Sequence, residues 1–266
     1  MFKGRVVALT GAGSGIGRAL ANEFARLGAR LALSDVNKIA VNETASMLDQ
    51  NVEVKCYAVD VSDRNAVCRF ADEVYRDFGT VDVIVNNAGT SVIASVEHLT
   101  FEEIEKVFAI NLWGVIYGTK AFLPIFLEKK NGMIINISSV FGLVATPCQG
   151  AYAMSKFAVR ALTETLWQEL EGTGVDAILV HPGGINTSIS KNSLVAEYKS
   201  DFERRAHEAM ISQMITTPED CARQIINGLV AGEKRLLVGN GARALHRLSR
   251  LFPTKYGTIM KKKLGY

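Results

Sequence analysis

The chain has 266 residues, of which 48% are hydrophobic and 21% charged, with only 5 prolines. This composition excludes a disordered or fibrous protein, and the length suits one large domain spanning residues 1–266. The net charge of +3 is uneven, because residues 241–266 hold seven Lys or Arg and no Asp or Glu, whereas the other 240 residues hold 23 basic and 27 acidic side chains.

The sequence shows no sign of export, of a membrane span or of a metal site. Met1 is followed almost at once by the apolar run 6–9, without the pattern of a signal peptide. No uninterrupted apolar run reaches the roughly 20 residues of a spanning helix. The four histidines lack i, i+4 spacing, and the four cysteines lack a C-x-x-C pair. We therefore predict a soluble cytoplasmic protein with neither a disulfide framework nor a bound metal.

Short apolar runs alternate with longer amphipathic stretches along the chain. Nearly continuous apolar runs predict buried parallel strands, here at residues 6–10, 31–34, 52–59, 81–86, 133–138, 175–181 and 236–238. The intervening stretches predict helices at residues 16–27, 38–48, 64–78, 101–127, 152–171 and 218–230. The alternation predicts a Rossmann-type, doubly wound α/β fold, with a mostly parallel seven-stranded sheet and helices on both faces.

The glycine-rich run TGAGSGIG, residues 10–17, lies between the first strand and the first helix. Without side chains the backbone can approach a pyrophosphate, and the free N–H groups of a helix N-terminus favour an anion. Asp35, at the end of the second strand, is placed to accept hydrogen bonds from a ribose 2′-OH and to repel a 2′-phosphate. These features predict NAD rather than NADP. Two alternatives stay open: Arg18 meeting a phosphate, and Asp35 as a surface or capping residue.

Tyr152 and Lys156 are four residues apart in a predicted helix, so their side chains share one face. An ammonium beside a phenol lowers the pKa of the tyrosine toward the working pH, as a general acid/base requires. The alternative is a pair that merely shares a helix surface. Ser139 follows the strand at 133–138, at the end where ligands bind in open α/β sheets. Its hydroxyl, or that of Ser138, can hydrogen-bond a substrate oxygen.

Together these motifs resemble the short-chain dehydrogenase/reductase family over nearly the whole chain. Residues 10–17 resemble its T-G-x-x-x-G-x-G loop, and residues 86–89 its N-N-A-G stretch. Ser139 and the Y-x-x-x-K at 152–156 resemble its active site, and residues 182–187 its P-G segment. The resemblance selects Ser139 over its neighbour.

The resemblance implies an NAD(P)-dependent oxidoreductase that moves a hydride between nicotinamide and a secondary alcohol or ketone. Tyr152 would transfer the proton, Ser139 would hold the oxygen and Lys156 would hold the nicotinamide ribose. Asn111 matches the family asparagine that holds a water in a proton relay, although a buried helix-bending asparagine is the alternative. The implied cofactor contacts are Gly11, Ser14, Gly15, Ile16, Gly17, Asp35, Asp60, Val61, Asn87, Ala88, Gly89, Tyr152, Lys156, Pro182, Gly183, Ile185 and Thr187.

Substrate choice and assembly are less constrained. The family sets specificity in loops, here residues 90–96, 141–150 and a polar insertion at 187–216 that is long enough to be a lid. Their apolar side chains suit a lipid-like, long-chain or steroid-like substrate, or else pack on the body: Val92, Ile93, Phe141, Leu143, Val144, Leu194, Met210 and Met214. The family implies a homo-oligomer, tetramer or dimer, through the helices at 101–127 and 152–171. A catalytically idle dinucleotide-binding regulator is the second function class, although Ser139, Tyr152 and Lys156 are all present.

The basic tail predicts an amphipathic helix over residues 242–252. Leucines and a phenylalanine recur at helical spacing, and Arg243, Arg247 and Arg250 fall on another face. Such a helix packs on the body or a neighbouring subunit, or lies on an anionic membrane through residues 242–263. Basic residues without interleaved aromatics do not indicate nucleic-acid binding.

Overall fold

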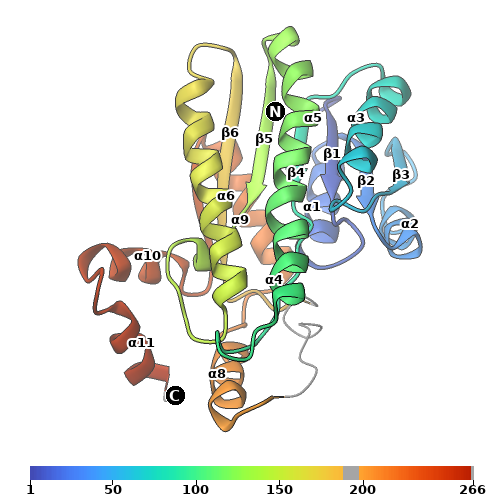
Figure 1. Ribbon diagram of the computed structural model, residues 1–266. Coiled ribbons are helices and arrows are strands. Elements are labelled where there is room, and N and C mark those ends of the chain that lie inside the picture. The colour runs from blue at the N-terminus through green and yellow to red at the C-terminus, as the bar shows by residue number, and fades with distance from the viewer. Residues whose placement is uncertain (188–197, 265–266) are drawn as a thin grey trace.

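A computed structural model describes residues 1–187 and 198–264 (Figure 1). Its centre is a seven-stranded sheet in the order β3-β2-β1-β4-β5-β6-β7, in which every neighbouring pair is parallel. The strands are β1 (Val6–Thr10), β2 (Arg30–Asp35), β3 (Val54–Ala58), β4 (Val83–Asn86), β5 (Gly132–Ile137), β6 (Val175–Gly183) and β7 (Arg235–Gly239). The predicted fold class is confirmed, with a sheet that is wholly rather than mostly parallel.

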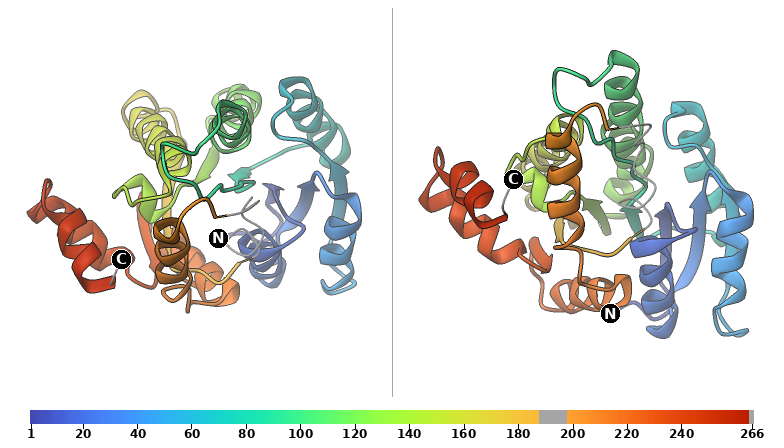
Figure 2. Two further views of the ribbon diagram at one scale, coloured as in Figure 1. Left: turned by 60° about the horizontal axis from the view of Figure 1, so that its bottom comes forward. Right: turned by 90° about the horizontal axis from the view of Figure 1, so that it is seen from below.

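Helices cover both faces of the sheet (Figure 2). One face packs on α1 (Gly15–Arg26), α2 (Lys38–Ser46) and α9 (Pro218–Val230), and the other on α3 (Arg64–Phe78), α5 (Gly114–Lys129) and α6 (Gly150–Glu169). Successive strand residues point to opposite faces, so Leu9 enters the first core and Ala8 the second. Burial on both faces explains why the strands are continuous apolar runs.

The predicted helix at 101–127 is formed by three segments. A capping box at Thr100 and Glu103 starts α4 (Phe101–Phe108), a π turn η1 (Ala109–Trp113) follows, and α5 completes the helix. The whole helix, Phe101–Lys129, has the length and mean hydropathy of a membrane-crossing segment. It packs against α3, β4 and β5, and the core helix of a globular domain has the same composition.

The insertion between β6 and α9 contains a helix that the sequence reading missed. This helix, α8 (Asp201–Ile211), is capped by Ser200, whose hydroxyl accepts a hydrogen bond from the Glu203 N–H. Its charged outer face made the segment resemble a polar loop. Part of the predicted lid, residues 188–197, lies outside the described residues.

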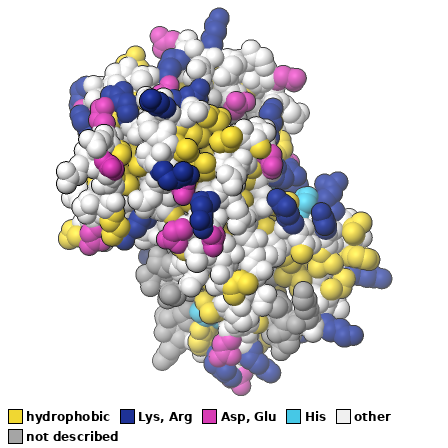
Figure 3. All heavy atoms as spheres, turned by 180° about the vertical axis from the view of Figure 1, so that it is seen from behind, with side chains coloured by type: hydrophobic (Ala, Val, Ile, Leu, Met, Phe, Trp, Pro, Cys, Tyr) yellow, Lys and Arg dark blue, Asp and Glu magenta, His cyan; other side chains and the backbone are white. Residues whose placement is uncertain are grey.

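The tail forms two helices rather than the one predicted. Gly241 precedes α10 (Ala242–Leu251), and α11 (Tyr256–Leu264) follows after a short turn. Figure 1 shows α10 running outward from the sheet and α11 returning toward α8. Seen from behind, the projecting part carries hydrophobic side chains among Lys and Arg (Figure 3).

Candidate active site

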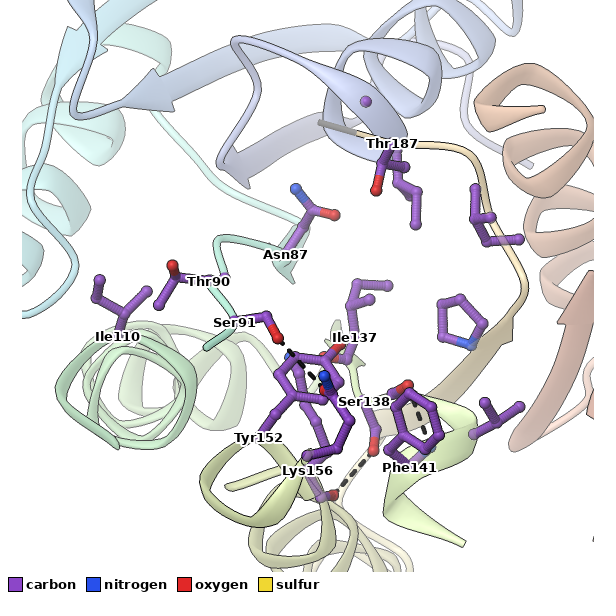
Figure 4. Close-up of a pocket in the computed structure, with 18 of the residues that line it drawn as sticks. Asn87, Thr90, Ser91, Ile110, Ile137, Ser138, Phe141, Tyr152, Lys156 and Thr187 are labelled. Atoms are coloured by element: carbon purple, nitrogen blue, oxygen red, sulfur yellow. Dashed lines mark hydrogen bonds between the residues drawn. The ribbon is translucent and has the colours of Figure 1, made fainter. Parts of the chain in front are cut away.

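A cavity of about 750 Å³ lies at the carboxyl ends of the strands, as the fold predicts. Figure 4 shows Tyr152 and Lys156 on one side of it and Asn87 and Thr187 on another. The cavity brings together most of the predicted site residues, from segments far apart in sequence: Gly11, Ser14, Gly15, Ile16, Gly17, Asp35, Asp60, Val61, Asn87, Ala88, Gly89, Ser139, Tyr152, Lys156, Pro182, Ile185 and Thr187.

The glycine loop between β1 and α1 is held by the end of β4. The Asn87 side-chain amide donates to the carbonyl oxygens of Thr10 (2.9 Å) and Gly11 (3.1 Å). A Cβ on Gly17 would fall 2.0 Å from the Gly11 oxygen, and Gly11 itself has a φ of +64°. Both positions therefore need glycine, and the loop backbone faces the cavity at the N-terminus of α1, where an anion is favoured.

Asp35 lines the cavity and also shapes the loop. Its carboxylate accepts hydrogen bonds from the backbone N–H groups of Gly13 and Asn37, both at 2.9 Å. A carboxylate has about four acceptor sites, so these bonds leave capacity for ribose hydroxyls. Arg18, the alternative phosphate partner, instead donates to Thr44 at 3.0 Å and pairs with Glu43 at 3.4 Å.

Ser139 is the second residue after β5, and its hydroxyl lies beside Tyr152. Its Oγ accepts a hydrogen bond from the Phe141 N–H at 3.1 Å. Burial raises the pKa of the Tyr152 phenol, and a hydrogen bond with the Ser139 side chain lowers it in part. Ser138 points its hydroxyl to the Lys156 carbonyl at 2.9 Å. The serine selected by the resemblance is thus the one paired with the tyrosine.

Lys156 lies under the tyrosine ring, with Nζ 5.6 Å from the ring centroid. The ammonium donates to the Ile137 carbonyl at 2.9 Å, and burial lowers its pKa to about 8. We expected the pKa of Tyr152 to lie below its usual value, and that expectation is wrong, because the pKa is raised. Burial is the largest cause of the pKa shift at both groups, because protein atoms replace part of the water around each side chain.

Two predicted residues lie in the wall and do not line the cavity. The Asn111 amide, fully buried in the π turn, holds both the N–H (2.8 Å) and the carbonyl (2.9 Å) of Thr90, and reaches Ser155 Oγ at 3.2 Å. Gly183 packs against Asn240, whose carbonyl oxygen would lie 2.5 Å from a Cβ at that position. Asn111 therefore shapes the loop after β4, and Gly183 permits the close approach of the segment after β7.

His181 is a site residue that the sequence reading missed. It is fully buried at the end of β6, and its Nδ1 lies 2.7 Å from the carbonyl oxygen of Ser139. Burial lowers the pKa of His181 to about 4, so the ring is neutral and Nδ1 carries the hydrogen. A polar residue at the end of the apolar run 177–180, directly before Pro182, was the available signal.

The substrate end of the cavity is largely apolar. Of the eight loop residues expected there, Ile93, Phe141, Met210 and Met214 line it. Val92, Leu143 and Val144 are buried and do not line the cavity, and Leu194 lies outside the described residues. Several lining residues were not anticipated, because they come from α8, the turn after β7 and the tail: Ala206, His207, Asn240, Ala244, Leu245 and Met260.

A buried carboxylate fixes α8 over this end. Glu203 is 2% exposed, and its carboxylate accepts from the Ser95 N–H (2.8 Å) and the Lys199 N–H (2.8 Å) and lies 2.9 Å from His98 Nδ1. Burial would raise the pKa of Glu203, but these hydrogen bonds outweigh it and lower the pKa to about 2. The ionised side chain therefore ties α8 to the loop after β4.

Comparisons with known proteins agree with this geometry. A short chain dehydrogenase family model matches residues 5–197. A Mycobacterium tuberculosis protein named "Putative oxidoreductase SadH" is 41% identical, covering 97% of this chain and 95% of that protein. Human estradiol 17-beta-dehydrogenase 11 is 31% identical, covering 98% of this chain and 84% of the relative.

A solved structure shows the same fold. The short chain dehydrogenase/reductase from Burkholderia phymatum in complex with NAD superimposes with a TM-score of 0.85 at 30% identity, covering 94% of each chain. Sequence, fold and the arrangement of the site lead to one assignment. The chain belongs to the short-chain dehydrogenase/reductase family of oxidoreductases.

Proposed function

We propose that the protein transfers a hydride between NAD and a secondary alcohol or ketone with an apolar body. The observation that carries the proposal is the joint placement of Ser139, Tyr152 and Lys156 on a cavity whose other end is the glycine loop. A bound nicotinamide supplies or accepts the hydride, and the residues of this chain handle the substrate oxygen and its proton.

The chemistry of the residues supports general acid/base catalysis by Tyr152. In the reductive direction the carbonyl oxygen accepts hydrogen bonds from the Ser139 and Tyr152 hydroxyls. The carbonyl carbon gains the hydride, and the carbonyl oxygen takes the proton of the Tyr152 phenol. The raised pKa of Tyr152 keeps that proton on the phenol until the oxygen becomes negative. Lys156 provides a positive neighbour that stabilises the phenolate left behind.

The cofactor preference is proposed from Asp35. Its carboxylate lines the dinucleotide end, would accept hydrogen bonds from a ribose 2′-OH, and would repel a 2′-phosphate. The Arg18 guanidinium already contacts Thr44 and Glu43. The related structure from Burkholderia phymatum also holds NAD.

The substrate class is proposed from the far end of the cavity. Ile93, Phe141, Met210, Leu245 and Met260 surround it with apolar atoms. The whole cavity, dinucleotide end included, has a volume of about 750 Å³, which is within the usual range for a small-molecule site. A lipid-like, long-chain or steroid-like alcohol fits this lining, and the name of the human relative, estradiol 17-beta-dehydrogenase 11, points to the same class.

We expect a cytoplasmic homo-oligomer, tetramer or dimer, formed through α4–α5 and α6. These helices carry exposed apolar side chains that an interface would bury, among them Trp113 (49% exposed) and Met154 (49%). Light scattering of the purified chain measures its oligomeric state.

Turnover of a graded panel tests the proposal. Secondary alcohols and ketones of increasing chain length, together with steroids, are followed by NADH absorbance with NADP(H) as comparison. We expect kcat/KM to rise with apolar size, and Asp35→Ala to narrow the difference between NAD and NADP. Cofactor binding without turnover of any compound would favour the idle regulator instead. Equal wild-type rates with both cofactors, unchanged by Asp35→Ala, would contradict the role of Asp35.

A further inference from the structure

The two tail helices form a projection, here called the tail wing (residues 242–262), with an apolar tip. Leu251 is 72% exposed, Phe252 46% and Ile259 40%. The tip lies where α10 turns into α11, since the Lys255 and Tyr256 N–H groups both donate to the Phe252 carbonyl. Single exposed apolar residues are normal, but a cluster on a projection is typical of an interaction site (Figure 3).

The tail wing carries basic side chains and contains no Asp or Glu. Arg243, Arg247 and Arg250 are exposed and share one face of α10, beside the face that carries Leu248 and Leu251. Lys255, Lys261 and Lys262 are exposed on the turn and α11. Within residues 1–187 and 198–264 none of these six cations forms an ion pair with a carboxylate, so the wing presents unneutralised positive charge.

The inner side of the tail wing belongs to the substrate end of the cavity. Ala242 and Met260 are buried, and Leu245 and Met260 line the cavity. The Tyr256 hydroxyl accepts a hydrogen bond from the Ala145 N–H at 3.1 Å. The wing is therefore fixed to the body, and the two helices that carry the apolar tip also contribute Leu245 and Met260 to the cavity.

We propose that the tail wing docks on an anionic lipid surface, with its apolar tip in the headgroup region and its cations on the lipid charges. This arrangement matches an interfacial amphipathic helix, which combines an apolar face with Lys and Arg. Docking places the substrate end of the cavity at the membrane, so that an apolar alcohol or ketone enters from lipid. Only this last step rests on the proposed function.

A lipid surface explains the tip better than a second copy of the chain does. A two-fold contact through the same patch sets like residues against each other, and would bring the two sets of arginines together. Like charges across an interface oppose association. Anionic lipid supplies the opposite charge in excess.

Vesicle co-sedimentation of the full chain tests the proposal. Vesicles of phosphatidylcholine alone are compared with vesicles that also contain phosphatidylglycerol, at low and high salt. We expect binding to the anionic vesicles that weakens with salt, by screening. The double variant Arg243→Gln with Arg247→Gln should weaken binding to the anionic vesicles about fivefold for each charge removed. The double variant Leu251→Ser with Phe252→Ser should weaken this binding by at least the effect of one lost charge.

The matched control is Ile39→Ser, which removes a side chain that is also 72% exposed but lies on α2. It should leave sedimentation unchanged. All these side chains are exposed, so the variants should fold, and circular dichroism checks this. No sedimentation of the wild type, or equal sedimentation of all variants, overturns the proposal. A change of oligomeric state in Leu251→Ser with Phe252→Ser, without vesicle binding, assigns the tip to a second copy.

Turnover separates docking from catalysis. With a short, water-soluble ketone the tip variants should keep the wild-type rate. With a long-chain ketone carried in anionic vesicles their rate should fall in proportion to the lost binding. Absence of turnover with both ketones in the wild type, with vesicle binding intact, contradicts the proposed function and leaves the docking surface standing. Equal wild-type and variant rates from vesicles overturn the delivery step.

Discussion

The two ends of the cavity are built in different ways. At the dinucleotide end, backbone and short polar side chains hold one another, as where Asn87 bonds to Thr10 and Gly11. At the substrate end, apolar side chains from α8, the loops and the tail wing meet. The structure of the dinucleotide end depends on close backbone contacts that only glycine permits. The structure of the substrate end depends on how side chains from several helices pack together.

The difference shows which end tolerates change. A backbone that must approach a pyrophosphate cannot move aside, so the dinucleotide end is the same for any substrate. An apolar wall accepts other residues of similar volume, so the substrate end can be altered without loss of the cofactor site. Tyr152 lies where the two ends meet and should matter for every substrate.

The largest effect is expected for Tyr152→Phe. Loss of the phenolic proton should lower kcat about a thousandfold, within the range for a general acid/base, for short and long substrates alike. The affinity for NADH, measured by fluorescence titration, should change little. Near wild-type turnover with cofactor bound would remove Tyr152 from the proton transfer.

The next effect concerns the dinucleotide end alone. In Gly17→Ala the new Cβ would lie 2.0 Å from the Gly11 oxygen, so the loop must shift. We expect about 3 kcal/mol of lost stability, typical of overpacking, and NADH binding weakened about a hundredfold.

Gly257→Ala is the control for the glycine change. Among the described residues, no heavy atom lies within 4 Å of the Cβ position of this helical glycine in α11. Alanine there should raise the free energy of unfolding by about 0.5 kcal/mol or more and leave NADH binding unchanged. Denaturant unfolding and titration measure both, and similar losses in the two variants would contradict a steric role of Gly17.

Glu203→Gln probes the substrate end. It replaces an ionised acceptor that holds Ser95 and Lys199, so α8 should loosen. KM for apolar ketones should rise about tenfold, matching a cost of about 1–3 kcal/mol for disrupted buried hydrogen bonds, with NADH affinity unaffected. If the affinity for NADH fell as much as KM for apolar ketones rose, α8 would not act on the substrate end separately.

The pH dependence of unfolding gives a second test of Glu203. Its pKa is lowered from 4.5 to about 2 in the folded chain. A lowered carboxyl pKa contributes stability that is fully present above the unfolded value and lost as the pH falls toward the folded value. The free energy of unfolding of the wild type should therefore exceed that of Glu203→Gln by less as the pH falls from 4.5 to about 2.

The smallest effect is expected at His181. Its Nδ1 hydrogen bond fixes the carbonyl of Ser139, at 2.7 Å. His181→Leu should lower kcat about fivefold, the equivalent of one net hydrogen bond, with KM and NADH affinity nearly unchanged. His181→Asn, which keeps a donor close to the Nδ1 position, should recover most of the rate. Equal kcat values for His181→Leu and His181→Asn would mean that His181 contributes only by packing.

The sequence by itself determined the sheet, the glycine loop and the Tyr152–Lys156 pair. These features follow from patterns among residues close in sequence: the alternation of apolar runs, missing side chains at a strand-to-helix turn, and i, i+4 spacing. The helix predicted over the arginine-rich tail is also present as α10, because the helical spacing of its apolar residues is a local pattern.

Only the tertiary structure decided what surrounds those residues. Glu203 meets Ser95 across 108 positions, and His181 meets Ser139 across 42, separations over which no sequence period operates. The direction of the Tyr152 pKa shift also changed, because desolvation depends on every element that encloses the phenol and not on the lysine one turn away. Local patterns specify elements and motifs, whereas burial and the pairing of distant polar groups arise only when the chain is folded.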